Sequence, residues 1–257
     1  MAAIHYTEKG NGFTIVLLHG FCENLHIWDS LIPQLSKEFR VITIDLPGFG
    51  KSKGLPASHS IDDVADVVLD FISNDRKLEA CMVLGHSLGG YVMLAMAEKR
   101  PDIFSGIGLL HSTANADLPE RRVARNRVID FVKENGVAAF VQSFIPPLFA
   151  DQANPAIAGT VEFALGTPLS TLISYTAAMR DRPDRNHVLK SYTKPVLFVA
   201  GKYDSLIPVE SIETQARQAV KAQIVVLEKS AHMAMLEQTN DTATAILSFV
   251  RPLAGHP

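Results

Sequence analysis

The stretch Val83-Leu84-Gly85-His86-Ser87-Leu88-Gly89-Gly90 decides the fold of this chain, because an apolar run passes through Gly-x-Ser-x-Gly directly into a helix. A tight strand-to-helix turn of this kind lifts the serine hydroxyl above the edge of a sheet and leaves no room for side chains at the flanking glycines. The helix that begins there turns its free N-terminal amides toward a developing negative charge. The pattern therefore predicts that Ser87 is a nucleophile and that the amide of Leu88 stabilises an oxyanion.

The sequence on either side of the pentapeptide supports this interpretation, since Gly-x-Ser-x-Gly alone is a weak signal. Residues 80–84 form an apolar run of strand length, and beyond Ser87 apolar residues repeat at helical spacing until Arg100-Pro101. A glycine-rich structural turn with a buried serine is the alternative interpretation.

Composition narrows the class of protein. The 257 residues carry a net charge of -3 and no long basic run, so nothing suggests a nucleic-acid partner. The two cysteines, Cys22 and Cys81, do not suggest a disulfide framework. The first residues lack the pattern of a secretory signal, and no apolar run reaches membrane-spanning length. We expect a soluble cytoplasmic protein with no membrane partner; the oligomeric state is left open.

Further apolar runs of strand length follow one another along both flanks of the chain. They lie at residues 14–18, 40–45, 103–110, 195–200 and 223–227. Amphipathic stretches separate these runs, among them a helix expected around residues 28–35 and another capped by Ser60. Apolar strands that alternate with helices predict an α/β fold with a mostly parallel central sheet, flanked by helices, whose reactive loops lie at the carboxyl ends of the strands.

The pattern changes between Ser112 and about Ser191, where helix-like segments with proline breaks replace the strands. About eighty residues between two strands is far more than a single crossover needs. We therefore expect a helical cap over residues 113–190, inserted into a core formed by residues 1–112 and 191–257. Ordinary crossover helices are the alternative.

His232 and Asp204 are the predicted base and orienting acid for the serine. Asp204 follows the run at residues 195–200 and His232 follows the last run, so both belong to loops at the same sheet edge as Ser87. The order Ser, Asp, His is the one expected when a triad is built on a strand-turn-helix elbow. Asp117, which follows the preceding strand, is the alternative acid, and Asp204 would then be a turn residue.

Together these motifs resemble the α/β-hydrolase superfamily, in its serine esterase branch with a small helical cap. The resemblance spans nearly the whole chain outside the cap. It rests on His19-Gly20, Asp45-Leu46-Pro47-Gly48-Phe49-Gly50-Lys51-Ser52, the Gly85 to Gly90 motif, Gly201 through Asp204 to Pro208, and His232 in the final loop.

The resemblance implies that the amide of Phe21, directly after His19-Gly20, is the second oxyanion donor beside that of Leu88. Dehalogenase and epoxide hydrolase relatives place an aspartate at the elbow, so Ser87 argues against both chemistries. No Cys/His metal spacing and no phosphate-binding glycine loop is found in the sequence, so we expect neither a metal nor another cofactor.

The cap is expected to set specificity. Phe140, Phe144 and Phe149 are candidate substrate-binding residues, although they could equally hold the cap helices together. His111 could line the pocket, with a structural histidine as the alternative. Four arginines, at positions 121, 122, 125 and 127, form a basic cluster on the first cap helix. A solvated face is one interpretation of this cluster; an arginine turned inward would favour a carboxylate-bearing substrate.

The sequence therefore predicts a serine hydrolase that cleaves carboxylic esters of small to medium acyl chains, with a small-molecule ester as its partner. The resemblance also admits lactone, thioester or carbon-carbon bond hydrolysis and a synthase-type lyase reaction on an anionic substrate. A small-molecule receptor or pseudoenzyme on the same fold is the alternative from another class.

Overall fold

The computed structural model describes residues 3–255. Within this range seven strands form one sheet in the order β1-β3-β2-β4-β5-β6-β7. Strand β1 runs antiparallel to β3, and all other neighbouring strands are parallel. The strands are β1 Tyr6–Lys9, β2 Thr14–Leu18, β3 Arg40–Ile44, β4 Cys81–His86, β5 Phe104–Leu110, β6 Val196–Gly201 and β7 Ala222–Leu227.

The predicted runs correspond to β2 through β7, and the predicted α/β fold with a mostly parallel sheet is confirmed. The sequence pattern missed β1. This strand has four half-buried or exposed residues at the edge of the sheet, so it lacks the continuous apolar run that identifies its buried neighbours.

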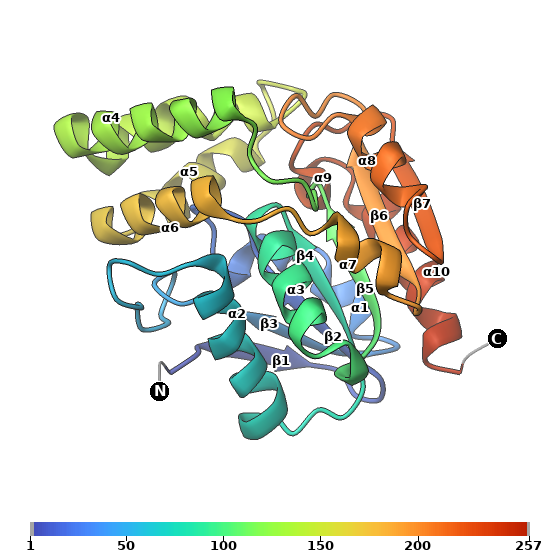
Figure 1. Cartoon of the computed structure of the whole chain (residues 1–257). Coiled ribbons are helices and arrows are strands. Elements are labelled where there is room, and N and C mark those ends of the chain that lie inside the picture. The colour runs from blue at the N-terminus through green and yellow to red at the C-terminus, as the bar shows by residue number, and fades with distance from the viewer. Residues whose placement is uncertain (1–2, 256–257) are drawn as a thin grey trace.

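Ten α-helices are described; some cover the two faces of the sheet and the others lie beyond it (Figure 1). They are α1 Ile32–Leu35, α2 Ile61–Asp70, α3 Leu88–Lys99, α4 Pro119–Phe144, α5 Ala156–Leu165, α6 Leu169–Asp181, α7 Asn186–Ser191, α8 Val209–Ala216, α9 Ala234–Glu237 and α10 Thr239–Leu253. The helix expected around residues 28–35 is divided into a short 3-10 helix, Leu25–Trp28, and α1. Ser60 caps α2 as predicted, with its hydroxyl accepting the amide of Asp63.

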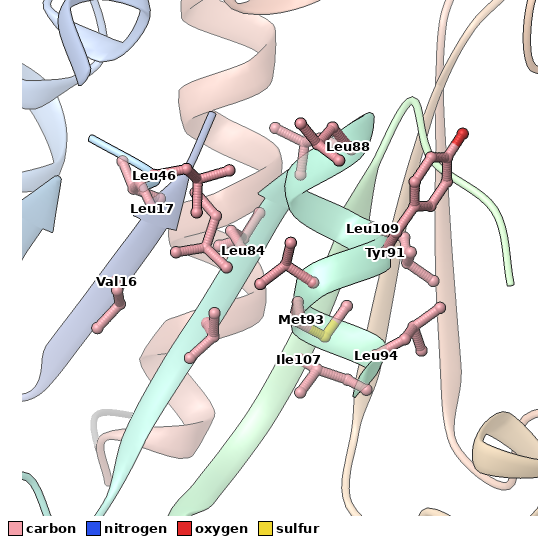
Figure 2. Packing of buried hydrophobic residues seen from close by; sticks show 14 of the residues in the cluster. Val16, Leu17, Leu46, Leu84, Leu88, Tyr91, Met93, Leu94, Ile107 and Leu109 are labelled. Atoms are coloured by element: carbon pink, nitrogen blue, oxygen red, sulfur yellow. The ribbon is translucent and has the colours of Figure 1, made fainter. Parts of the chain in front are cut away.

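The buried core lies on both faces of the sheet. Figure 2 shows Met93 of α3 beside Ile107 of β5, and Gly90 of α3 lies close to Leu109, whereas Leu84 packs toward Gly108 on the other face. Every residue of β2 and β4 is buried, as a parallel strand covered on both faces requires. This packing fixes β4 and α3 relative to each other, and the turn between them is therefore held rigidly.

Between β5 and β6 the chain forms only helices within the described residues. Helices α4, α5 and α6 lie together at the top of the view in Figure 1, beyond the sheet, and α4 packs on both of the others. Helix α4 is kinked at Gly136, which has φ 79°. The boundaries 113–190 for a cap stay a prediction.

Within residues 3–255 no single helix is long and apolar enough to cross a bilayer. Taken together, α5 and α6 have sufficient length and apolar composition, but they are bent by 101° relative to each other.

Candidate active site

Ser87 occupies the turn between β4 and α3 in a strained conformation, with φ 47° and ψ -112°. Its amide donates to the carbonyl of Leu110 at 2.9 Å, and its own carbonyl accepts the Ser112 hydroxyl at 2.7 Å. A side chain at Gly85 would overlap the backbone of Gly89, as the elbow pattern predicts. Backbone contacts on both sides therefore hold Ser87 in a conformation that an isolated peptide would avoid.

The amides of Phe21 and Leu88 both have free hydrogen-bonding capacity. Within residues 3–255 neither amide donates a hydrogen bond. Leu88 is the first residue of α3, so its N–H group is one of the unpaired donors at a helix start. Phe21 is followed by Cys22, whose φ of 59° marks a second tight turn. Neither amide is therefore committed to a partner within the described residues.

His232 and Asp204 lie side by side at the carboxyl ends of β6 and β7. His232 Nδ1 is 2.8 Å from Asp204 Oδ2. The other oxygen, Oδ1, accepts the amides of Leu206 and Ile207 at 2.9 and 3.0 Å. Burial would raise the pKa of Asp204, but His232 and His111 beside it, and their hydrogen bonds, hold that pKa well below its usual range. The carboxylate therefore stays ionised and fixes the orientation of the imidazole.

Asp117, the alternative orienting acid, lies in a different environment. Its carboxylate pairs with Arg182 at 2.7 Å and with Arg125 at 3.1 Å. Burial acts to raise the pKa of Asp117, but the arginines beside it, Arg182 foremost, lower that pKa overall. Asp117 thus serves as the counter-ion of Arg182 and Arg125, whereas Asp204 is the acid beside His232.

The backbone of His232 is held from two sides. Its amide donates to the carbonyl of Leu148 at 2.9 Å, and its carbonyl oxygen lies 2.9 Å from Nε2 of His86. Nδ1 of His86 is 3.1 Å from Glu23 Oε2, which also accepts the amide of Gly20 at 2.7 Å. Burial acts to lower the pKa of His86, but the Glu23 carboxylate more than offsets it and raises that pKa. No local sequence pattern indicated these contacts, because the residues that form them are far apart along the chain.

His111 is fully buried and does not line the cavity at Ser87. Its Nδ1 lies 3.2 Å from Asp204 Oδ2, the oxygen that His232 also approaches. Its Nε2 is buried without a hydrogen-bond partner, and burial lowers the pKa of His111 to about 4 in spite of Asp204. This placement corresponds to the structural alternative for His111 rather than to the pocket wall.

A cavity of about 160 Å³ brings the predicted residues together. Ser87, His232 and Phe21 line it with Phe144, so one of the three candidate phenylalanines is on its wall. The remaining lining residues are Tyr91, Arg121, Ala124, Arg125, Val128, Met179, Leu206 and Ile207.

The other two candidate phenylalanines do not line this cavity. Phe140 is buried, its ring stacks on Phe144 with the ring centroids 5.0 Å apart, and it also contacts Phe21. Phe149 belongs to the buried core. The structure therefore corrects the predicted wall at these two positions and at His111.

Helix α4 contributes a face that the sequence only partly indicated. Arg121, Ala124, Arg125 and Val128 all line the cavity, and their spacing of three and four residues places them on one side of the helix. Arg122 and Arg127 are exposed. The basic cluster is thus divided between the cavity and the solvent, a division that helical spacing alone could have suggested.

A thiol and a possible metal-ligand cluster also lie at or beside the site. Cys22 is fully buried, and burial raises the pKa of its thiol far above its usual range. His111, Asp204 and His232 offer three possible metal-ligand atoms within 4.8 Å of one another. Both histidine Nδ1 atoms already lie within hydrogen-bond distance of the aspartate, so a metal would have to displace these contacts.

Residues 14–154 match the family model described as alpha/beta hydrolase fold, and residues 173–251 match one described as TAP-like protein. The first match spans more than half of the chain, so this protein belongs to the alpha/beta hydrolase fold family.

Relatives place the chain on the esterase branch of that family, and it is a hydrolase. It is 30% identical to a pimeloyl-acyl-carrier protein methyl ester esterase of Neisseria meningitidis serogroup B, over 92% of each chain. It is 27% identical to the enzyme of the same name from Nitrosomonas europaea, over 92% of this chain and 95% of the relative. A solved structure of a thermophilic esterase from Thermogutta terrifontis, with malate bound, has a TM-score of 0.93 and 28% identity over 98% of this chain and 94% of that one.

Proposed function

We propose that this protein is a serine hydrolase that cleaves carboxylic esters of small to medium acyl chains through an acyl-enzyme. One observation carries the proposal. Ser87 and His232 line the same cavity, and His232 Nδ1 lies 2.8 Å from Asp204 Oδ2. The esterase names of the relatives support the same reaction class.

In the proposed mechanism the Ser87 hydroxyl attacks the ester carbonyl while Nε2 of His232 takes its proton. Asp204 stabilises the imidazolium that forms, and the amides of Phe21 and Leu88 stabilise the oxyanion. The imidazolium then gives its proton to the departing alcohol, which leaves Ser87 acylated. Water, deprotonated by His232, attacks the acyl group and releases the acid.

The size of the cavity supports a small acyl group. Its volume of about 160 Å³ is close to that of an apolar cavity of about 150 Å³ that accepts a benzene ring. A larger cavity of about 540 Å³ lies next to it and shares Arg121, Leu206 and Ile207 with it. Longer chains would therefore have to extend past these three residues.

Fluorophosphonate labelling combined with turnover of p-nitrophenyl esters from acetate to decanoate tests the proposal. We expect one label on Ser87 by intact mass and peptide mapping, multiple turnovers, and highest activity on the shorter esters. Ser87→Ala should lose the label and reduce kcat by at least about 10⁴-fold. Ser191→Ala, which removes a hydroxyl that bonds the carbonyl of His187 in α7, is the matched control and should retain both.

Full turnover by folded Ser87→Ala would contradict the assignment of the nucleophile. A folded wild-type protein that shows neither labelling nor turnover of any ester would contradict the proposed function as a whole.

A further inference from the structure

Two guanidinium groups, those of Arg121 and Arg125, line the cavity that contains Ser87. No carboxylate is among the residues that line this cavity, and apart from Ser87 and His232 its wall is otherwise largely apolar. Positive charge in a small, partly apolar space is costly unless it meets an opposite charge. The residues behind the wall show how much of this charge is already balanced.

Asp117 is the counter-ion behind these arginines. It pairs with Arg182 at 2.7 Å and Arg125 at 3.1 Å, and with Arg121 at the longer distance of 3.7 Å. Within residues 3–255 no other carboxylate forms an ion pair with any of the three guanidinium groups. One carboxylate therefore serves three cations, which leaves the group with an excess of two positive charges.

Arg125 has donors to spare. Only its Nε atom donates to Asp117, and within the described residues its two terminal nitrogens donate no hydrogen bond. The Arg125 side chain is 17% exposed and forms part of the cavity wall. Arg121 uses one terminal nitrogen on the carbonyl of Leu206 at 3.1 Å. The pair thus presents free N–H groups in a fixed position beside the proposed nucleophile.

Arg182 does not compete for the same ligand. It is nearly fully buried, donates to Asp117 and to the carbonyl of Met179, and lies over the ring of Tyr91 at 3.9 Å. Arg182 donates to Oδ1 of Asp117 while Nε of Arg125 donates to Oδ2, so Asp117 is held between the two guanidinium groups and fixes Nε of Arg125. A guanidinium group held in this way is well suited to bind a carboxylate through parallel hydrogen bonds.

We propose that Arg125 and Arg121 form a carboxylate subsite, so that the preferred substrate is a short ester that carries a free carboxylate. This inference rests on the proposed function, because the ester carbonyl must be at Ser87 while the carboxylate is at the arginines. The volume of about 160 Å³ favours a short half-ester of a dicarboxylic acid or an ester of a small hydroxy acid. Both substrates carry a free carboxylate, which belongs to the acyl group in the half-ester and to the alcohol in the hydroxy-acid ester.

Matched ester pairs test the subsite. Monomethyl glutarate, which is charged, is compared with its uncharged amide of nearly equal size. O-acetylglycolate and its amide are the corresponding pair with the carboxylate on the alcohol side. We expect kcat/KM to favour the charged ester at least about 10-fold in one of the two pairs. The preference should shrink only modestly as salt is added, because charges that are mostly buried, as Arg125 is, are screened less than exposed ones.

Arg125→Gln should reduce this charged-to-neutral ratio roughly 10- to 100-fold, since a charge-assisted interaction is lost. Arg127→Gln is the matched control, because Arg127 is an exposed residue of the same helix outside the cavity lining. It should leave the ratio unchanged. Circular dichroism shows whether Arg125→Gln folds. If it does not, Arg121→Gln and Arg125→Lys are used to measure the change in the charged-to-neutral ratio.

Calorimetric titration of the Ser87→Ala variant with monomethyl glutarate and with its amide gives a readout that needs no turnover. Stronger binding of the charged ester, weakened by Arg125→Gln, would support the subsite even without hydrolysis. A wild-type enzyme that hydrolyses both members of each pair equally would overturn the subsite but leave the esterase proposal intact. Loss of all labelling and turnover would instead overturn the esterase proposal.

Discussion

His111 and Asp204 are in direct contact, with Nδ1 of the histidine 3.2 Å from Oδ2 of the aspartate. The two residues follow neighbouring parallel strands, β5 and β6. His111 has a left-handed backbone, with φ 46°, and its amide donates to the carbonyl of Val199 at 2.9 Å. A strained and buried residue that holds the acid beside His232 is a positioning residue in the proposed mechanism.

Replacement of His111 should therefore affect turnover more than binding. We expect His111→Asn to lower kcat by roughly 3- to 10-fold, because one hydrogen bond to Asp204 is lost, while KM changes by less than about 2-fold. Steady-state kinetics on a p-nitrophenyl ester measure both quantities. His26→Gln is the control, since His26 is an exposed histidine paired with Asp29. An increase in KM at constant kcat would instead indicate that His111 contacts the substrate.

His111 should also make the folded state sensitive to acid. Burial lowers its pKa from 6.5 to about 4, so the histidine contributes its full stability above pH 6.5 and loses it as the pH falls toward 4. Between pH 7.5 and pH 5 this loss amounts to about 2 kcal/mol of unfolding free energy. Urea unfolding at the two pH values should show a pH dependence smaller by about that amount in His111→Asn. Equal pH dependence in the two proteins would rule out this contribution.

The backbone strain at Ser87 should appear in the stability of substitutions there. Glycine tolerates a positive φ without steric cost, whereas alanine does not. We expect Ser87→Gly to be more stable than Ser87→Ala by about 1 to 2 kcal/mol, although glycine gains more entropy on unfolding. Thermal or urea unfolding of the two variants measures this difference directly. If Ser87→Ala proved the more stable, the turn would not store strain at this position.

Gly89 permits the close approach of α3 to the end of β2. A Cβ atom there would overlap the carbonyl of Leu18 and come within 2.8 Å of the His19 carbonyl oxygen. Gly89→Ala should therefore lower the unfolding free energy by at least about 2 kcal/mol. Gly159→Ala is the contrast within helix α5, because a Cβ atom there meets nothing within 4 Å. Gly159→Ala should raise the unfolding free energy by about 0.5 to 1 kcal/mol. Urea unfolding of the two variants measures both changes.

Several parts of this protein were predictable because they depend on neighbours in sequence. Strands β2 to β7 follow largely apolar runs, most of them buried, and the elbow at Ser87 is a local pattern of glycines between a strand and a helix. Carboxyl ends of parallel strands share one edge, so the sequence also predicted that Asp204, His232 and Ser87 belong to loops on the same side of the sheet. Their catalytic roles stay predictions for the labelling experiment to test.

The tertiary structure alone decided which of these side chains meet. Asp204 and Asp117 follow strands in a similar way in the sequence, but one lies beside His232 and the other beside Arg182. The contact between His86 and the backbone of His232 joins residues 146 positions apart, so no local pattern could reveal it. Helical spacing divided the basic cluster of α4 into faces, but only the position of α4 in the folded chain placed Arg121 and Arg125 on the wall of the cavity that contains Ser87. The local backbone is determined by the sequence because the interactions that form strands, helices and turns join residues close together in the chain. The partner of a buried charge depends instead on distant segments that come together only on folding.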